Sequence, residues 1–104
     1  MAIIDLSNTN TYPRIKRVTL GITAQEITLP PACTQIKFLA EADMYWANEG
    51  ADGDAFTTTI TEYAKLPANA EQVVQMERGN QSNRKLLLAV QTGTGFVSIV
   101  IEKD

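Results

Sequence analysis

The sequence predicts an all-β protein, an antiparallel two-sheet sandwich of jelly-roll-like form with seven or eight short strands. Three observations predict it. Apolar and polar residues alternate with a period of two along several segments, as they do in half-buried strands. Turn signals rich in Gly, Pro, Asn and Asp separate these segments at intervals typical of sandwiches. The one candidate helical turn, at 68–76, follows Pro67 and contains the β-branched pair Val73-Val74, which argues against a longer helix.

The expected strands follow one another from Arg14 onward, each defined by a short apolar set or run. In order these are Val18, Leu20 and Ile22; Ile27 and Leu29; Ile36, Phe38 and Ala40; Met44–Ala47; 56–61; 73–76; Leu86, Leu88 and Val90; and Val97, Ile99 and Ile101. Lys37 is expected to point outward between its inward neighbours. Residues 48–54 have the composition of a loop, and 92–95 carry a hairpin signal before the last strand.

A chain of 104 residues has room for one domain with one core. We divide it into an N-terminal extended arm, 1–13, and a single sandwich domain, 14–104. The arm contains the apolar residues Ile3, Ile4 and Leu6 and then a polar run without periodicity. We expect these three side chains to pack on the domain's own sheet or on a neighbouring molecule. Because ordering an arm costs conformational entropy, we expect it to be ordered only when docked.

Two segments of the chain form a short internal repeat. The sequence Leu-Pro-Pro-Ala-Cys-Thr-Gln-Ile at 29–36 aligns with Leu-Pro-Ala-Asn-Ala-Glu-Gln-Val at 66–73. Leu, Pro and Gln coincide, and Ile stands opposite Val. In each segment we expect a strand to end at the proline, the chain to turn a corner, and a new strand to begin at the branched residue. Two such corners are what a two-sheet sandwich requires.

The composition argues against the commonest catalytic and binding chemistries. The chain has no histidine, the most frequent general base and metal ligand, and its one cysteine, Cys33, can form neither an internal disulfide nor a zinc site. Its net charge is −3, whereas nucleic-acid binding usually needs a basic surplus. It shows neither a signal peptide nor a run long enough to cross a bilayer. We therefore predict no enzyme activity, no cofactor, no metal site, and no nucleic-acid or membrane partner.

An acidic stretch around 41–54 leaves two weaker alternatives open. Paired carboxylates could serve glycoside hydrolysis, and Glu49, Asp52 and Asp54 could bind calcium through oxygen ligands. Neither spacing matches a known loop, so a solvated loop tip is the favoured interpretation. The sequence leaves open whether 49–54 binds a cation.

Three sets of residues are candidate protein interfaces. Tyr45 and Trp46 are adjacent and so face opposite sides of a strand; both residue types are enriched at interface anchors and also stack on sugars. Phe96 and Val100 lie on the outward side of the last strand, and Leu87 likewise opposes its inward neighbours. A strand that is apolar on both sides is buried on both sides. This indicates cover by a partner subunit, a neighbour or the arm. The apolar part of the arm is the third set.

A series of segments in chain order shares the layout of one known group of proteins. The segments are Arg17-Val18-Thr19-Leu20-Gly21; Leu29-Pro30; Ile36-Lys37-Phe38; Met44-Tyr45-Trp46-Ala47; Tyr63-Ala64-Lys65-Leu66-Pro67-Ala68-Asn69; 86–90; and 94–102. In this order they resemble small β-sandwich structural and accessory proteins of tailed bacteriophage virions, of the capsid decoration or cement type. The resemblance covers 14–104 loosely, and 49–62 departs from the shorter middle loop of that family.

The resemblance implies a non-enzymatic virion structural protein, made in the host cytoplasm, whose partner is the viral capsid or another virion protein. The first expectation is a capsid decoration or cement protein that binds and stabilises the capsid lattice as a homo-oligomer. A head or tail fibre part or a tail accessory component is one alternative. A carbohydrate-binding module, with Tyr45 or Trp46 as the stacking platform, is another. The resemblance implies no catalytic residues.

Overall fold

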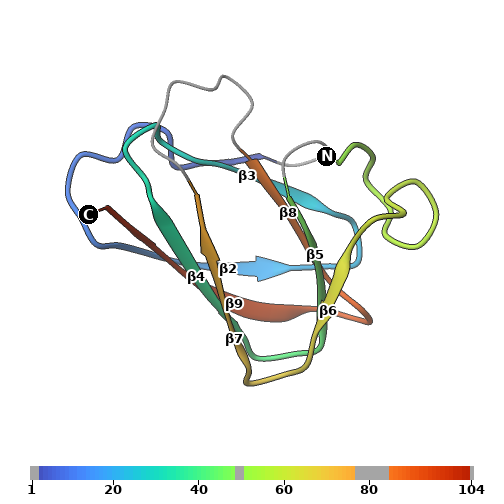
Figure 1. Cartoon of the computed structure of the whole chain (residues 1–104). Helices are drawn as coiled ribbons and strands as arrows, with labels where there is room; N and C mark the ends of the chain where they lie inside the picture. Colours follow the sequence, from blue (N-terminus) through green and yellow to red (C-terminus); the bar gives the residue numbers. More distant parts are fainter. Residues whose placement is uncertain (1–2, 49–50, 77–84, 104) are drawn as a thin grey trace.

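The chain forms two β-sheets that pack face to face (Figure 1). The computed structural model describes residues 3–48, 51–76 and 85–103, and within them it contains nine strands and no helix. One sheet has the strand order β1-β3-β8-β5-β6 and the other β2-β9-β4-β7; neighbours are antiparallel, except that β1 and β3 run parallel. The strands are β1 (Ile3–Asp5), β2 (Arg14–Leu20), β3 (Gln25–Thr28), β4 (Gln35–Ala40), β5 (Met44–Ala47), β6 (Ala64–Leu66), β7 (Glu71–Gln75), β8 (Lys85–Val90) and β9 (Gly95–Glu102). The predicted all-β class with two mostly antiparallel sheets is confirmed.

The main core lies between the two sheets and is built from the inward sets that the alternation predicts. Ile36, Phe38 and Ala40 of β4 are at most 1% exposed. Other strands of both sheets add Leu20, Ile27, Met44, Leu66, Leu86, Leu88, Val90, Val97, Ile99 and Ile101. Ile22 departs from its expected set and is 62% exposed, because β2 ends two residues earlier and Ile22 lies in the connection to β3.

Both proline corners carry the chain from one sheet to the other, as predicted. Pro30 lies between β3 and β4, and Pro67 lies between β6 and β7; each first strand is in the five-stranded sheet and each second strand in the four-stranded one. Equivalent positions of the internal repeat make the same hydrogen bond. The amide of Cys33 donates to the carbonyl of Pro30 at 3.2 Å, and the amide of Ala70 donates to the carbonyl of Pro67 at 3.3 Å. The two corners differ in backbone conformation, however, because Asn69 has φ 64° and the aligned Ala32 has no positive φ.

The turn at 92–95 is also a crossing between sheets, so the hairpin predicted there is wrong. β8 belongs to the five-stranded sheet and β9 to the four-stranded one. The end of β8 bonds elsewhere: the amide of Val90 donates to the carbonyl of Gly21 at 3.0 Å, and the amide of Gln91 donates to that of Asp43 at 2.9 Å. Both strands bring apolar sets to the same core from opposite layers, and a two-stranded hairpin could not bury both sets against each other.

The strand predicted at 56–61 is wrong as well. This segment lies in the connection between β5 and β6, where an isolated bridge joins Phe56 to Ile60. The hydroxyl of Thr59 donates to the carbonyl of Ala55 at 3.1 Å, and Thr57 has a left-handed backbone with φ 72°. Hydrogen bonds from threonine side chains to the nearby backbone stabilise a turn here, and they outweigh the strand propensity of the branched side chains.

Residues 3–6, which the sequence assigns to the arm, lie in the five-stranded sheet. β1 pairs with β3, placing Ile4 opposite Ile27, and the amide of Leu6 donates to the carbonyl of Thr28 at 2.9 Å. Leu6 is 1% exposed and belongs to the main core. These hydrogen bonds and this burial offset the entropy cost of ordering the segment. Residues 3–6 therefore pack on the domain's own sheet, which is one of the two places expected for them.

Candidate interaction surface

The middle of the outer face of the five-stranded sheet, over β8 and β5, is covered by the chain's own 51–63 segment. Phe56 and Ile60 of this segment are 7% and 1% exposed, and they form a second buried cluster with Leu87 and Ala89 of β8. β8 is the middle strand of its sheet, so its other side faces the main core. Both sides of β8 are buried, as the sequence predicts. The cover is neither a partner subunit nor the arm, but a loop of the same chain.

Tyr45 and Trp46 face opposite sides of β5, as expected for adjacent strand residues. Tyr45 enters the second cluster, where its ring stacks on Phe56 at 5.4 Å between centroids and meets Tyr63 edge-on at 5.1 Å. Trp46 packs on the main core and meets Phe38 edge-on at 5.5 Å. Both rings therefore make intramolecular aromatic contacts of the geometry that stabilises protein interiors. This arrangement favours a packing role over a sugar-stacking platform.

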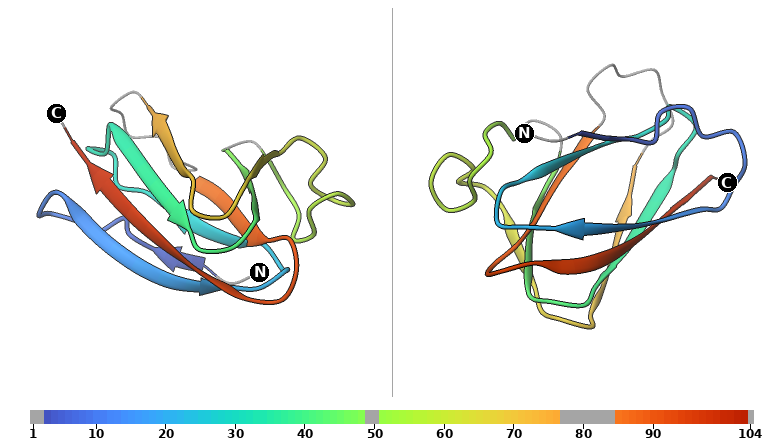
Figure 2. Two further views of the ribbon diagram at one scale, coloured as in Figure 1. Left: turned by 90° about the horizontal axis from the view of Figure 1, so that it is seen from below. Right: turned by 180° about the vertical axis from the view of Figure 1, so that it is seen from behind.

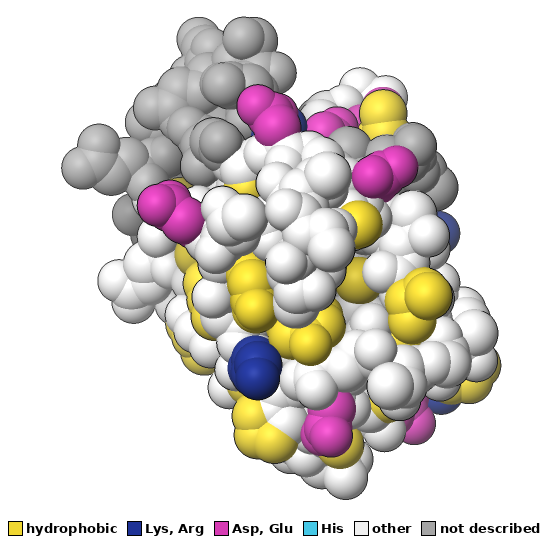
Figure 3. Space-filling view, turned by 90° about the vertical axis from the view of Figure 1, so that its right-hand side faces the viewer, with side chains coloured by type: hydrophobic (Ala, Val, Ile, Leu, Met, Phe, Trp, Pro, Cys, Tyr) yellow, Lys and Arg dark blue, Asp and Glu magenta, His cyan; other side chains and the backbone are white. Residues whose placement is uncertain are grey.

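Charged and polar contacts attach the 51–63 segment to the sheet. The ammonium group of Lys85 lies 3.4 Å from Asp52 Oδ1 and 3.7 Å from Glu26 Oε1. Gly53 has φ 116°, and a Cβ there would lie 2.5 Å from Thr59 Oγ1, so the turn requires glycine. Figure 3 looks at this side of the molecule, where apolar side chains form small patches separated by polar and charged atoms.

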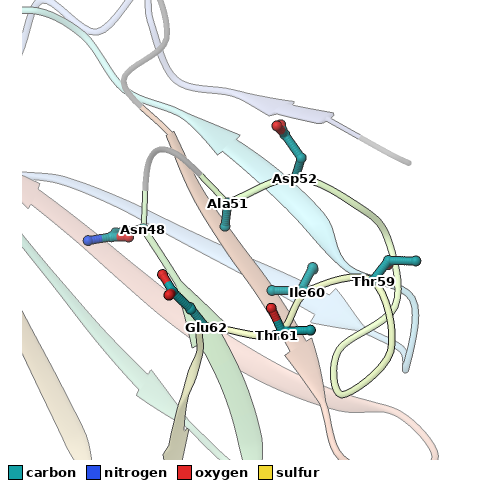
Figure 4. A pocket seen from close by; sticks show the side chains of 7 residues that line it. All are labelled: Asn48, Ala51, Asp52, Thr59, Ile60, Thr61 and Glu62. Atoms are coloured by element: carbon teal, nitrogen blue, oxygen red, sulfur yellow. The ribbon is translucent and has the colours of Figure 1, made fainter.

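The same segment borders a hollow of about 270 Å³ (Figure 4). The lining residues are Asn48, Ala51, Asp52, Thr59, Ile60, Thr61 and Glu62. The carboxylates of Asp52 and Glu62 do not point toward one another in Figure 4, and the Asp52 side chain is 92% exposed. Across residues 3–48, 51–76 and 85–103, no three acidic or Cys side chains gather in a way that could hold a metal ion. Glu49, part of the predicted acidic loop, lies outside the described residues.

The outer face of the four-stranded sheet has no such cover from the described part of the chain. Figure 2 (left) shows β2, β9, β4 and β7 side by side in this sheet. Alternation along each strand sends one set of side chains outward. We call this set the outer face; it consists of Ile15, Arg17 and Thr19 of β2, Phe96, Ser98, Val100 and Glu102 of β9, Gln35, Lys37 and Leu39 of β4, and Glu71, Val73 and Gln75 of β7.

The outer face gathers most of the exposed large apolar side chains that the structure describes. Six such side chains are exposed among the described residues, and four of them lie here: Ile15 at 69%, Leu39 at 42%, Val73 at 41% and Phe96 at 43%. Single exposed apolar residues are ordinary on protein surfaces. Four of them on one sheet face are more than single exposed residues, which makes the outer face the candidate interaction surface of the described residues.

Charged groups of both signs lie among these apolar side chains. Arg17 Nη2 is 2.9 Å from Glu41 Oε2, and the Arg17 guanidinium sits 3.9 Å from the ring centroid of Phe96. Lys37 Nζ is 3.4 Å from Glu102 Oε1. Exposed ion pairs of this kind contribute little to the free energy of folding. These pairs do, however, fix the positions of the aliphatic parts of Arg17 and Lys37 and of the Phe96 ring. Because each pair joins a cation to an anion, they add no net charge to the surface.

The structure places the predicted interface residues on several separate surfaces. Phe96 and Val100 lie together on the outer face, as expected from the last strand. Ile3 is 61% exposed on the edge strand of the other sheet, whereas Leu6 is in the main core. Ile4, Tyr45 and Trp46 are half-buried and pack against the buried clusters.

Sequence reasoning missed Ile15, Leu39 and Val73. Each is an apolar residue out of phase with the inward set of its own strand, and this was the signal that could have identified it. Their alignment on one face becomes visible only when the register between strands is known.

A comparison with known protein families, curated proteins and solved structures finds no match to this chain. In the described residues there is also no helix of the length and apolarity that crossing a membrane requires.

Proposed function

We propose that this chain is a non-enzymatic structural protein of a bacteriophage virion, in the first place a capsid decoration or cement protein that stabilises the capsid by protein–protein contact. The outer face of the four-stranded sheet is its contact surface. The observation that carries the proposal is the contrast between the two sheets. The chain covers one outer face with its own 51–63 segment and leaves four large apolar side chains exposed on the other.

The order of the strands supports a jelly-roll form of sandwich. With β1 set aside as an added edge strand, the two sheets read β2-β9-β4-β7 and β3-β8-β5-β6. Numbered from one to eight, these become 1-8-3-6 and 2-7-4-5, the arrangement that follows when a long hairpin of strand pairs is wrapped around a barrel. Jelly rolls of eight strands are common in viral capsid proteins and in lectins. The fold thus agrees with a virion role but is not specific to it.

The side chains of the outer face favour protein contact over sugar binding. A sugar-binding surface needs an aromatic ring free to stack on the ligand, and Tyr45 and Trp46 are both engaged in aromatic contacts within the chain. Phe96 is exposed on the outer face, but the guanidinium of Arg17 lies over its ring. An interface between proteins needs an apolar centre with polar groups around it. Leu39, Val73 and Val100 supply the apolar area, with Lys37 between Val73 and Val100 and Arg17 on the neighbouring row.

The proposal is tested by co-sedimentation with capsids. The chain would be co-expressed with the major capsid protein encoded near its own gene, and the assembled particles would be pelleted through sucrose. Leu39→Glu places a charge at the centre of the outer face, whereas Ile22→Glu places the same charge on an exposed apolar residue outside it. Retained fluorescence of Trp46 reports that each variant is folded.

We expect the wild type and Ile22→Glu in the particle pellet and Leu39→Glu in the supernatant. A wild-type chain that stays in the supernatant would overturn the decoration role. Equal amounts of all three proteins in the pellet would show that the particle is met through some other surface. A gene with no virion genes around it would also count against the proposal.

A further inference from the structure

We propose that the outer face binds a second copy of this chain, forming a two-fold symmetric dimer whose axis runs along the strands between β9 and β4. This inference rests on the proposed function only in taking the outer face as a protein contact surface. It adds a second copy as the partner of the free protein, which a capsid binding at the same face would displace, and the geometry of the contact. The argument comes from the register of the four strands.

The register arranges the centre of the outer face in two rows that run across the sheet. The first row is Ile15, Val100, Lys37 and Val73, from β2, β9, β4 and β7. The second row, one pleat along, is Arg17, Ser98, Leu39 and Glu71. Each row therefore begins and ends with residues of matching chemistry: apolar with apolar in the first, and a cation with an anion in the second.

A two-fold axis parallel to the strands places each row over the same row of the second copy, in reverse order. In a face-to-face dimer, β2 of one copy then lies over β7 of the other. Ile15 meets the second copy's Val73, and Arg17 meets its Glu71. At the centre, Val100 meets the second copy's Lys37, and Ser98 meets its Leu39. Because the operation is symmetric, each contact occurs twice. Strand directions in the two facing sheets stay nearly aligned, which is the common way for sheets to pack.

A two-fold axis across the strands, placed between the two rows, gives a poorer match. It exchanges the rows, so that Ile15 would meet Arg17 of the second copy and Val73 would meet its Glu71. Arg17 would keep only its bond to Glu41, and Glu71 would face an apolar side chain with no ion pair from the described residues, which is costly once water is excluded. Lys37 faces an apolar side chain about either axis, so the pairing of Arg17 with Glu71 favours the axis along the strands.

The two charged residues are available for such a contact. The Arg17 side chain is 55% exposed, and a guanidinium group has five N–H donors, more than its single bond to Glu41 uses. Glu71 is exposed at the start of β7 and makes no ion pair with any residue in the described ranges. A second copy would thus add a partner for Glu71 without breaking an existing pair.

The edges of the same sheet are less suited to binding a second copy. On the edge strand β2, Lys16 is on the side of the inward set yet remains exposed, and an inward-pointing charge of this kind hinders edge-to-edge pairing.

The size of the outer face sets the expected strength of the dimer. Four strands spaced by about 4.8 Å, with roughly six residues each, give the face about 400 Å² of flat area. The two copies together would then bury roughly 800 Å², which is less than a typical specific interface, so we expect a weak dimer with a Kd in the micromolar range or above.

Sedimentation equilibrium of the wild type and two charge-reversal variants tests the proposal. Arg17→Glu sets two glutamates against each other at both symmetric contacts, and Glu71→Arg sets two arginines against each other. Each variant alone should dimerise about tenfold more weakly than the wild type. An equimolar mixture of the two variants restores an opposite-charge pair at both contacts, so the mixture should form a heterodimer with near wild-type affinity. Lys65→Glu, a charge reversal on β6 of the other sheet, is the control and should leave the Kd unchanged.

A wild type that stays monomeric up to about 1 mM would overturn the dimer. A wild-type dimer that neither variant weakens would overturn the proposed contact, as would a mixture that stays as weak as its components. These outcomes are distinct from a failure of the virion role. A monomeric chain whose Leu39→Glu variant still loses the capsid would keep the outer face as the capsid contact. A dimer that never pellets with particles would keep this inference and overturn the decoration role.

Discussion

Two leucines provide a matched test of which sheet face the chain itself covers. Leu87 lies on the outer side of β8, in the middle of the five-stranded sheet, and is fully buried under the 51–63 segment. Leu39 lies on the outer side of β4, an inner strand of the four-stranded sheet, and is 42% exposed. The same substitution, Leu→Ala, removes the same atoms from both positions.

The expected losses of stability differ because the surroundings differ. Truncating a fully buried leucine loses the transfer free energy of its side chain and leaves a cavity, together about 2–5 kcal/mol. We expect about 3 kcal/mol at Leu87. At Leu39 part of the side chain is already in water and no closed cavity forms, so we expect less than about 1 kcal/mol. A domain of this size has a total free energy of unfolding of only about 5–15 kcal/mol, so the loss at Leu87 is a large fraction of it.

Urea unfolding followed by the fluorescence of the single tryptophan, Trp46, measures both losses. With an m-value of about 1 kcal/mol per molar, Leu87→Ala should lower the midpoint by roughly 3 M and Leu39→Ala by less than about 1 M. The protein is kept dilute so that contacts between copies do not contribute. Similar shifts for the two variants at unchanged m-values would refute the reasoning, because they would mean that the 51–63 segment does not bury the outer side of β8.

Two further predictions concern the loop turn and the first strand. Gly53→Ala should lower the free energy of unfolding by about 1–3 kcal/mol or more, because φ is 116° and the new Cβ would lie 2.5 Å from Thr59 Oγ1. Gly93→Ala, where φ is 67° and the surrounding space is open, should lower it by about 1 kcal/mol. Equal urea midpoints for the two variants would contradict this difference. Hydrogen bonds from Ser7, chiefly from its hydroxyl and to a lesser extent from its amide, lower the pKa of Asp5 below its usual 3.8. The contribution of Asp5 to stability is therefore present above pH 3.8 and is lost as the pH falls through the lowered pKa. A carboxyl titration by NMR should find this low pKa of Asp5 in the wild type and a higher one in Ser7→Ala, and an unchanged pKa in the variant would rule out the proposed cause.

Local signals in the sequence anticipated the layers of the fold. The period-two sets identified the inward side of most strands, since that alternation follows from the pleat alone. The internal repeat around Pro30 and Pro67 located two corners between the sheets because proline ends a strand whatever surrounds it. These features depend on residues close together in the chain, and a single sequence contains them.

Features set by contacts between distant residues were not accessible in the same way. The predicted hairpin at 92–95 followed local propensity, which the packing of the two sheets overrode. The predicted strand at 56–61 is wrong for a local reason, because hydrogen bonds from threonine to backbone three or four residues away stabilise a turn instead. The cover of Leu87 comes from a loop more than twenty residues earlier in the chain. Likewise, the outer face combines side chains from four strands, and only the register between those strands brings Ile15 and Val73 into one row.

The central claim is that the outer face of the four-stranded sheet is a surface for protein contact, and in the first place for a second copy. Methyl NMR spectra of the wild type, recorded from about 10 μM to about 1 mM, test it most directly, since this range brackets a weak dimer. We predict concentration-dependent shifts confined to the methyl groups of Ile15, Leu39, Val73 and Val100, with those of Leu87 unchanged. Spectra that do not change over this range, or shifts centred on the 51–63 segment, would contradict the claim.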